Sequence, residues 1–111
     1  MKHIKKYEEH KDISDTIEPG KPKTNDYVIV KSNDTILKDL LNNNPGKIVK
    51  TIVYNNEIIY NVRWDNIPKE IQKIFKGKKH INLAYRAKEI VNFAPTKEEL
   101  YIKLATNKYN I

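Results

Sequence analysis

The sequence predicts a single α+β domain in which an antiparallel sheet is accompanied by three helices. The 111 residues suit one domain with one hydrophobic core. Short runs of β-branched and aromatic residues, the usual composition of strands, alternate with turn residues between positions 27 and 93. Helix-start signals occur near positions 34, 68 and 96. Together these observations place both kinds of element in one compact unit.

The first 25 residues are expected to form an N-terminal arm or linker that is partly disordered. Prolines flank a glycine at positions 19–22, and this pattern disfavours both a helix and a central strand. A brief helix over residues 4–10 is the alternative for the start of the chain. The domain proper is then expected at residues 26–111.

The first strand is expected at residues 27–31, where aromatic and β-branched residues follow an Asn-Asp turn pair. Asp34 is a suitable cap for a short helix with apolar residues at helical spacing, namely Ile36, Leu37, Leu40 and Leu41. Three asparagines and a Pro-Gly pair then end that helix. We expect this helical insertion to pack back on the sheet.

A β-hairpin is expected over residues 47–65. Its two strands, 47–54 and 57–65, are separated by two asparagines, which tolerate the positive φ angles of a two-residue turn. Strict alternation on the first strand predicts that Lys50 shares a face with isoleucines 48 and 52, and that Thr51 lies on the other face with valines 49 and 53. On the returning strand, alternation gives one face to Tyr60, Val62 and Trp64.

Two further helices are expected, with strands between them. Pro68 suits the first turn of a helix over residues 69–76 that ends at Gly77, with Ile71, Ile74 and Phe75 on one side and lysines on the other. Residues 81–93 predict one or two strands broken near positions 86–87. A capping box at positions 96–99 then starts a helix whose apolar stripe should dock on the sheet, through Leu100, Tyr101, Leu104 and Ala105.

The order of these segments resembles the small SH3-like barrels, and the KOW type in particular. The resemblance covers residues 25–65 and includes Asp-Tyr-Val-Ile-Val at 26–30, Pro-Gly-Lys-Ile-Val-Lys-Thr-Ile at 45–52 and Tyr-Asn-Val-Arg-Trp at 60–64. It implies a small SH3-like antiparallel β-barrel with a helical insertion, a basic helix and a C-terminal helix. The chain is also similar to small uncharacterised proteins of large bacteriophages and giant viruses, a similarity that implies no activity.

The excess of positive charge is concentrated in one stretch. The formal net charge is +7, and residues 69–88 contain seven basic residues but one acidic residue. Such a cluster indicates binding to the nucleic-acid backbone, whereas an ordinary solvated face is the alternative. Lysines in place of arginines favour backbone contact over base reading. The candidate nucleic-acid-binding residues are Lys69, Lys73, Lys76, Lys78, Lys79, Arg86 and Lys88.

Three residues of the returning strand are candidates for an aromatic or surface contact: Tyr60, Arg63 and Trp64. The aromatic pair could stack on bases or line a peptide groove, but alternation with Val62 favours the core for both. Arg63 points the other way, and a salt bridge with Asp65 or Glu57 is favoured there over a partner contact.

The chain offers little to catalysis. It has no cysteine, and its histidines, at positions 3, 10 and 80, lack metal-ligand or general-base spacing on a rigid element. We therefore expect neither an enzyme, nor a metal site, nor a cofactor. No apolar run is long enough to suggest secretion or membrane insertion, so the expected location is the cytoplasm, or the host cytoplasm or virion for a viral protein.

These observations favour a non-enzymatic binding module that contacts nucleic-acid backbone through a basic surface. The rival hypothesis is a protein-interaction module, such as a virion accessory or structural protein, that uses a sheet edge or an aromatic groove. The sequence leaves the oligomeric state open.

Overall fold

The protein is described by a computed structural model that covers residues 11–109, apart from positions 33 and 36. The helix considered for residues 4–10 lies outside the described residues. The strands are β1 (Tyr27–Val30), β2 (Gly46–Tyr54), β3 (Glu57–Trp64), β4 (Ile81–Arg86) and β5 (Ile90–Ala94). The helices are α2 (Lys38–Asn43), α3 (Lys69–Ile74) and α4 (Lys97–Tyr109), with short 3-10 turns η2 (Ser14–Thr16) and η3 (Ala87–Glu89).

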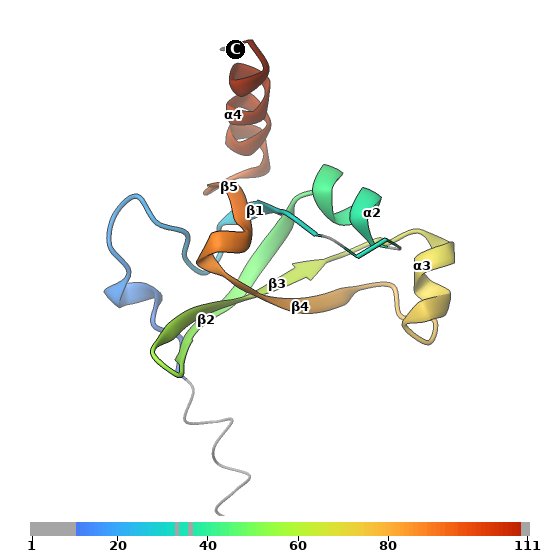
Figure 1. The fold of residues 1–111 in the computed structure, drawn as a ribbon, viewed down its shortest axis with the longest axis horizontal. Coiled ribbons are helices and arrows are strands. Elements are labelled where there is room, and N and C mark those ends of the chain that lie inside the picture. Colours follow the sequence, from blue (N-terminus) through green and yellow to red (C-terminus); the bar gives the residue numbers. More distant parts are fainter. Residues whose placement is uncertain (1–10, 33, 36, 110–111) are drawn as a thin grey trace, which may run out of the picture.

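The five strands form one antiparallel sheet in the order β4-β3-β2-β1-β5 (Figure 1). The predicted α+β class is confirmed. The sheet is not closed into the expected barrel, because β4 and β5 are its two edges and do not pair with each other among the described residues. No helix in the described part of the chain has the length and apolar character needed to cross a membrane.

The predicted hairpin is confirmed. Asn55 and Asn56 have φ angles of 51° and 64°, which is the conformation of a two-residue turn that matches the twist of the flanking strands. Tyr54 pairs with Glu57, and the ladder continues to Lys47 and Arg63. The break predicted within residues 81–93 is also confirmed, since η3 separates β4 from β5.

The predicted face assignment of β2 is wrong because the strand contains a bulge. Ile48 pairs with Val62 but Lys50 pairs with Asn61, so that one extra residue, Val49, is inserted between them. The insertion reverses the alternation, and Thr51 rather than Lys50 lies on the same face as Ile48. Thr51 is accordingly buried.

The main core lies between one face of the sheet and the two short helices. Leu37 precedes α2 and Leu41 lies within it, and both pack with the inward residues of the sheet; Ile67 and Ile71 close the core beside α3. The helical insertion therefore packs back on the sheet as predicted. The inward-facing residues of the strands are Val28, Val30, Ile48, Tyr60, Val62, Trp64, Ile81 and Tyr85.

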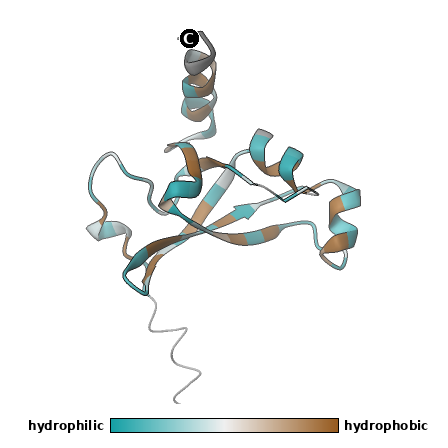
Figure 2. Ribbon diagram, in the orientation of Figure 1, coloured by the Kyte–Doolittle hydropathy of each residue, from teal (hydrophilic) through white to brown (hydrophobic). Residues whose placement is uncertain are grey.

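The helix α4 docks through less of its surface than the apolar stripe predicts. Its first turn begins as expected, with the Glu99 amide donating to Thr96 Oγ1 at 3.1 Å. Leu100 is buried against Ile29 and Ala94. The expected docking of Tyr101 is wrong, because its side chain is exposed, as is Ala105. Leu104, one turn further on, is partly buried against the same residues as predicted, and the helix projects from the sheet, with hydrophobic and hydrophilic residues alternating along it (Figures 1 and 2).

Residues 11–25, the segment expected to form an arm or linker, run beside β2 where β1 no longer pairs with it. The Ile13 amide donates to the Thr51 carbonyl at 2.8 Å, and the Asn25 amide donates to the Ile48 carbonyl at 2.8 Å. The Thr51 amide donates to the Asp12 carboxylate at 3.3 Å. The segment thus provides backbone partners for the part of β2 that extends beyond β1.

Candidate nucleic-acid interface

The helix α3 presents the first part of the predicted basic surface. Pro68 precedes it with a φ of −59°, the angle a helix start requires. Ile71 is buried and fixes the helix on the core, while the Gln72 side-chain amide donates to the Ile67 carbonyl at 2.8 Å. The chain then reverses through Lys76 and Gly77, whose φ angles are 58° and 80°. This tight reversal keeps the following lysines close to the helix.

Five of the predicted residues come together at this end of the molecule. All five are exposed, and none forms an ion pair among the described residues. They are Lys69, Lys73, Lys76, Lys78 and Lys79. Ile74, which the sequence places on the apolar side of the helix with Ile71 and Phe75, is 50% exposed; α3 is so short that only Ile71 and part of Phe75 reach the core. The lysine-rich helix therefore also carries an exposed apolar side chain.

The other two predicted residues, Arg86 and Lys88, do not join this group. Strand β4 separates them from Lys79, and its length is about 17 Å at roughly 3.4 Å per residue. Arg86 forms an ion pair with Glu57, Nε to Oε2, at 3.1 Å, and its amide donates to the Glu89 carboxylate at 2.9 Å. The predicted set is therefore divided between the two ends of β4.

Tyr60 and Trp64 are core residues, as the favoured interpretation holds. Their exposed fractions are 1% and 2%, which leaves neither ring available for stacking on a partner. Trp64 donates from Nε1 to the Asn44 carbonyl at 2.9 Å and meets Tyr85 edge to face at 5.9 Å. Burial raises the pKa of Tyr85 to about 12, so that its hydroxyl is neutral at physiological pH. Arg63 forms the expected salt bridge, with Asp65 at 2.8 Å.

A shallow hollow lies where β4 begins, beside the lysine group. It is lined by Phe75, Lys78, His80, Ile81 and Asn82. The sequence places Phe75 on the apolar side of the helix and does not single out Asn82, because the pattern gives no sign that the turn after α3 and the first residues of β4 border one depression. The lining combines the apolar side chains of Phe75 and Ile81 with the Lys78 ammonium and the Asn82 amide.

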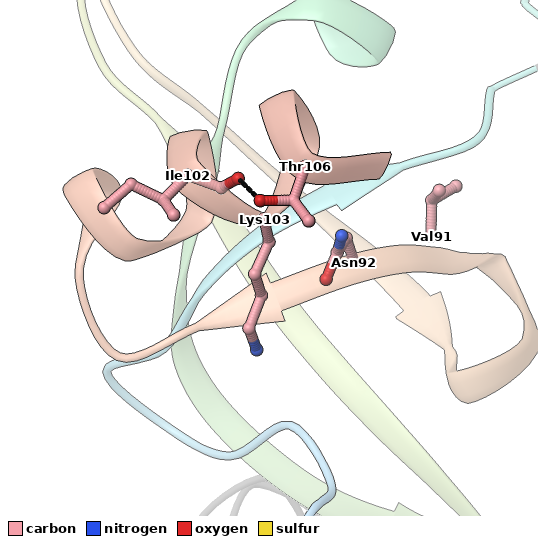
Figure 3. A pocket seen from close by; sticks show the side chains of 5 residues that line it. All are labelled: Val91, Asn92, Ile102, Lys103 and Thr106. Atoms are coloured by element: carbon pink, nitrogen blue, oxygen red, sulfur yellow. Dashed lines mark hydrogen bonds between the residues drawn. The ribbon is translucent and has the colours of Figure 1, made fainter. Parts of the chain in front are cut away.

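A second hollow lies between β5 and α4 and is lined by Val91, Asn92, Ile102, Lys103 and Thr106 (Figure 3). Val91 and Ile102 are 61% and 65% exposed. Lys103 extends along the sheet, where its Nζ donates to the Phe93 carbonyl at 2.8 Å and lies 5.2 Å from the centre of that ring. The Thr106 hydroxyl donates within the helix to the Ile102 carbonyl. The polar groups here are thus largely used within the protein.

Asp12 in the N-terminal segment and Asp26 just after it accept hydrogen bonds through their carboxylates. Burial raises the pKa of Asp12, but hydrogen bonds from Thr24, Ser14 and Thr51 outweigh it and hold the pKa below its usual value. Asp26 is buried just before β1, and its burial raises its pKa. In the part of the chain that the structure describes, no group of three or more potential ligands from His, Cys, Asp and Glu is arranged to hold a metal ion.

Comparison of the chain with protein-family models, with curated proteins and with solved structures found no match.

Proposed function

We propose that this chain is a non-enzymatic binding module that contacts the phosphate backbone of nucleic acid through the lysine group on and after α3. The group comprises Lys69, Lys73, Lys76, Lys78 and Lys79. Neutralising phosphates with such side chains releases condensed counterions, which supplies sequence-independent affinity.

The observation that carries the proposal is that these lysines are gathered, exposed and without an acidic partner among the described residues. A lysine face that merely keeps a protein soluble is usually interspersed with acidic residues. Here Glu70 is the one acidic residue within residues 69–88. The lack of arginine in the group favours contact with the backbone rather than with base edges.

We also propose that the sheet is an open form of the SH3-like arrangement. Three placements support this relation: the buried Asp26 directly precedes β1, Gly46 opens β2, and β3 returns across a tight hairpin. These are the positions at which the sequence resembles the KOW type. The relation concerns the fold, and the proposed activity rests on the lysines.

Charge reversal tests the proposal. The variant Lys69→Glu, Lys73→Glu and Lys79→Glu should weaken binding of a labelled oligothymidylate, measured by fluorescence anisotropy across a salt series. Each phosphate contact contributes about 0.7 to the slope of log affinity against log salt for single strands, so losing three should reduce the slope by about 2. Lys76 is left unchanged because its positive φ would add backbone strain to the effect.

The matched control reverses three exposed lysines elsewhere: Lys21, Lys31 and Lys38. It changes the net charge by the same amount and should retain most of the affinity and the original slope. Equal losses in both variants would mean that net charge, not this surface, governs binding. Absence of binding by the unmodified protein at low salt would refute the proposal directly.

A further inference from the structure

The two edge strands of the sheet, β5 and β4, differ in whether side chains block their outer main-chain groups. On β5 the free edge is blocked by side chains: Lys103 Nζ donates to the Phe93 carbonyl at 2.8 Å, and the Phe93 amide donates to Asn92 Oδ1 at 2.9 Å. A register shift opposite Ile29 also inserts Val91 as a bulge. Natural sheets protect their edges in such ways against unwanted strand pairing. Strand β5 is therefore a poor template for another strand.

The hydrogen bonds of β2 show which main-chain amides and carbonyls of β4 point away from β3. The Thr51 amide and carbonyl are bonded to Asp12 and Ile13, on the side away from β3. Tyr60 pairs with Thr51, so its own amide and carbonyl must face β4, where its partner is Tyr85. Because backbone groups alternate between the two sides of a strand, Tyr85 faces β3.

The same alternation turns Asn82, Ala84 and Arg86 toward the free edge of β4. The Arg86 amide agrees with this assignment, because it donates to the Glu89 carboxylate rather than to β3. Asn82 and Ala84 are both exposed, and among the described residues no group bonds to their outward amides and carbonyls. Two amides and two carbonyls are thus available in a row.

Lysines lie at both ends of this open edge, but at the far end the Glu57 and Glu89 carboxylates offset the charge of Arg86 and Lys88. Lys78 and Lys79 precede β4, and Lys88 follows it, all exposed and all without an ion pair among the described residues. The hollow that includes Phe75 and His80 borders the first of these ends. An extended chain lying along β4 would bring one of its ends close to Lys78 and Lys79.

We propose that β4 accepts an extended segment of a partner protein as a sixth strand, and that this segment carries acidic side chains at the end that lies beside Lys78 and Lys79. The main-chain groups of Asn82 and Ala84 supply the hydrogen bonds, while Lys78 and Lys79 select for the acidic end. This surface shares Lys78 and Lys79 with the lysine group of the proposed nucleic-acid contact, but its main-chain groups lie on β4, outside that group.

The test uses a fluorescein-labelled peptide, Asp-Glu-Val-Thr-Val-Thr-Glu-Asp, in an anisotropy titration against the full chain. Ala84→Pro removes one outward amide without removing a bond to β3, and proline is tolerated in such edge positions. We expect about a tenfold loss of affinity from the missing hydrogen bond and the altered edge. Ala84→Val keeps the amide and should bind within about twofold of the unmodified protein.

Two further peptides separate strand addition from simple charge attraction. The same peptide N-methylated on alternate residues keeps its charge but loses main-chain donors, and it should bind at least about tenfold more weakly. Its counterpart with lysines at both ends should not bind. These measurements use the unmodified protein, so they decide the matter even where Ala84→Pro does not fold.

Absence of binding by the acidic peptide, or equal binding of its N-methylated form, would overturn the proposal. Oligothymidylate binding by Ala84→Pro gives an independent readout. It should be unchanged, because position 84 lies outside the lysine group on and after α3. Failure of the peptide experiments with oligonucleotide binding intact would remove this inference and leave the proposed function standing.

Discussion

The substitution Gly46→Ala tests the packing at the point where β2 enters the sheet. A methyl group at this position would lie 2.5 Å from Val62 Cγ1, 2.7 Å from Trp64 Cε2 and 2.9 Å from Trp64 Cζ2. Neither neighbour can easily move: Val62 is β-branched and fully buried, and the Trp64 indole is held by its hydrogen bond to the Asn44 carbonyl. The added methyl must therefore strain the core.

The size of the effect follows from two opposing terms. Overpacking a well-filled core costs about 1–3 kcal/mol, and contacts below 3 Å with two fixed side chains place Gly46→Ala at the upper end. Replacing glycine also restricts the unfolded chain, which offsets about 0.4–1 kcal/mol. We therefore expect a net loss of about 2 kcal/mol in the free energy of unfolding, or a fall of about 10 °C in Tm.

Urea unfolding followed by the fluorescence of the single tryptophan measures this loss directly. A double-mutant cycle that combines Gly46→Ala with Val62→Ala tests whether the steric clash causes the loss, because removing Val62 Cγ1 vacates the space that the new methyl needs. The double variant should be less destabilised than the sum of the two single variants by at least about 1 kcal/mol. An unchanged unfolding midpoint for Gly46→Ala, or strict additivity in the cycle, would refute the packing described around Gly46.

Two further predictions concern the N-terminal segment and the hairpin. Because the pKa of Asp12 is lowered in the folded state, its ionised form stabilises the protein above the usual value of 3.8, and this stabilisation is lost as the pH falls through the lowered pKa. Asp12→Asn should therefore reduce Tm at pH 7 and have little effect near pH 2; an equal effect at both pH values would contradict the role of the charge. Asn56 has a φ of 64°, so Asn56→Gly should stabilise the hairpin turn by about 0.5 kcal/mol in urea unfolding. A loss of stability would instead show that the Asn56 side chain is needed there.

The parts of the fold that could be predicted are those whose signals are local. The Asn-Asn pair between two strand-forming runs specified the hairpin, and Thr96 with Glu99 specified the start of α4. The bulge at Val49 has no such signal, because a single inserted residue leaves the composition of a strand unchanged. The extent of docking by α4 depends on where the sheet ends beneath it, which periodicity cannot supply.

The predicted set of basic residues also divides into a part that local sequence predicts correctly and a part that it does not. Lys69, Lys73 and Lys76 lie on or just after one short helix, and the turn through Gly77 brings Lys78 and Lys79 beside them. Closeness in sequence here became closeness in space because the chain reverses. Arg86 and Lys88 are equally near along the sequence, but an extended strand intervenes and carries them away from the group. Charge counted along a sequence therefore overstates a surface wherever a strand crosses the charged stretch.

The open edge of β4 depends on a local feature far from it. In a two-residue hairpin the flanking pair, here Tyr54 and Glu57, exchanges both main-chain hydrogen bonds, and bonded and unbonded pairs then alternate along the ladder. Three steps along, the Thr51 and Tyr60 pair is unbonded, which turns the main chain of Tyr60 toward β4. Because Tyr60 pairs with Tyr85, the main chain of Tyr85 faces β3. The main chain of Ala84, one residue earlier, therefore points to the free edge. A slip of one residue between β3 and β4 would instead turn the main chains of Leu83 and Tyr85 to the free edge. The same slip would expose the Tyr85 side chain. The burial of Tyr85 in the core therefore fixes the register in which Asn82 and Ala84 present their main-chain groups, as the proposed strand addition requires.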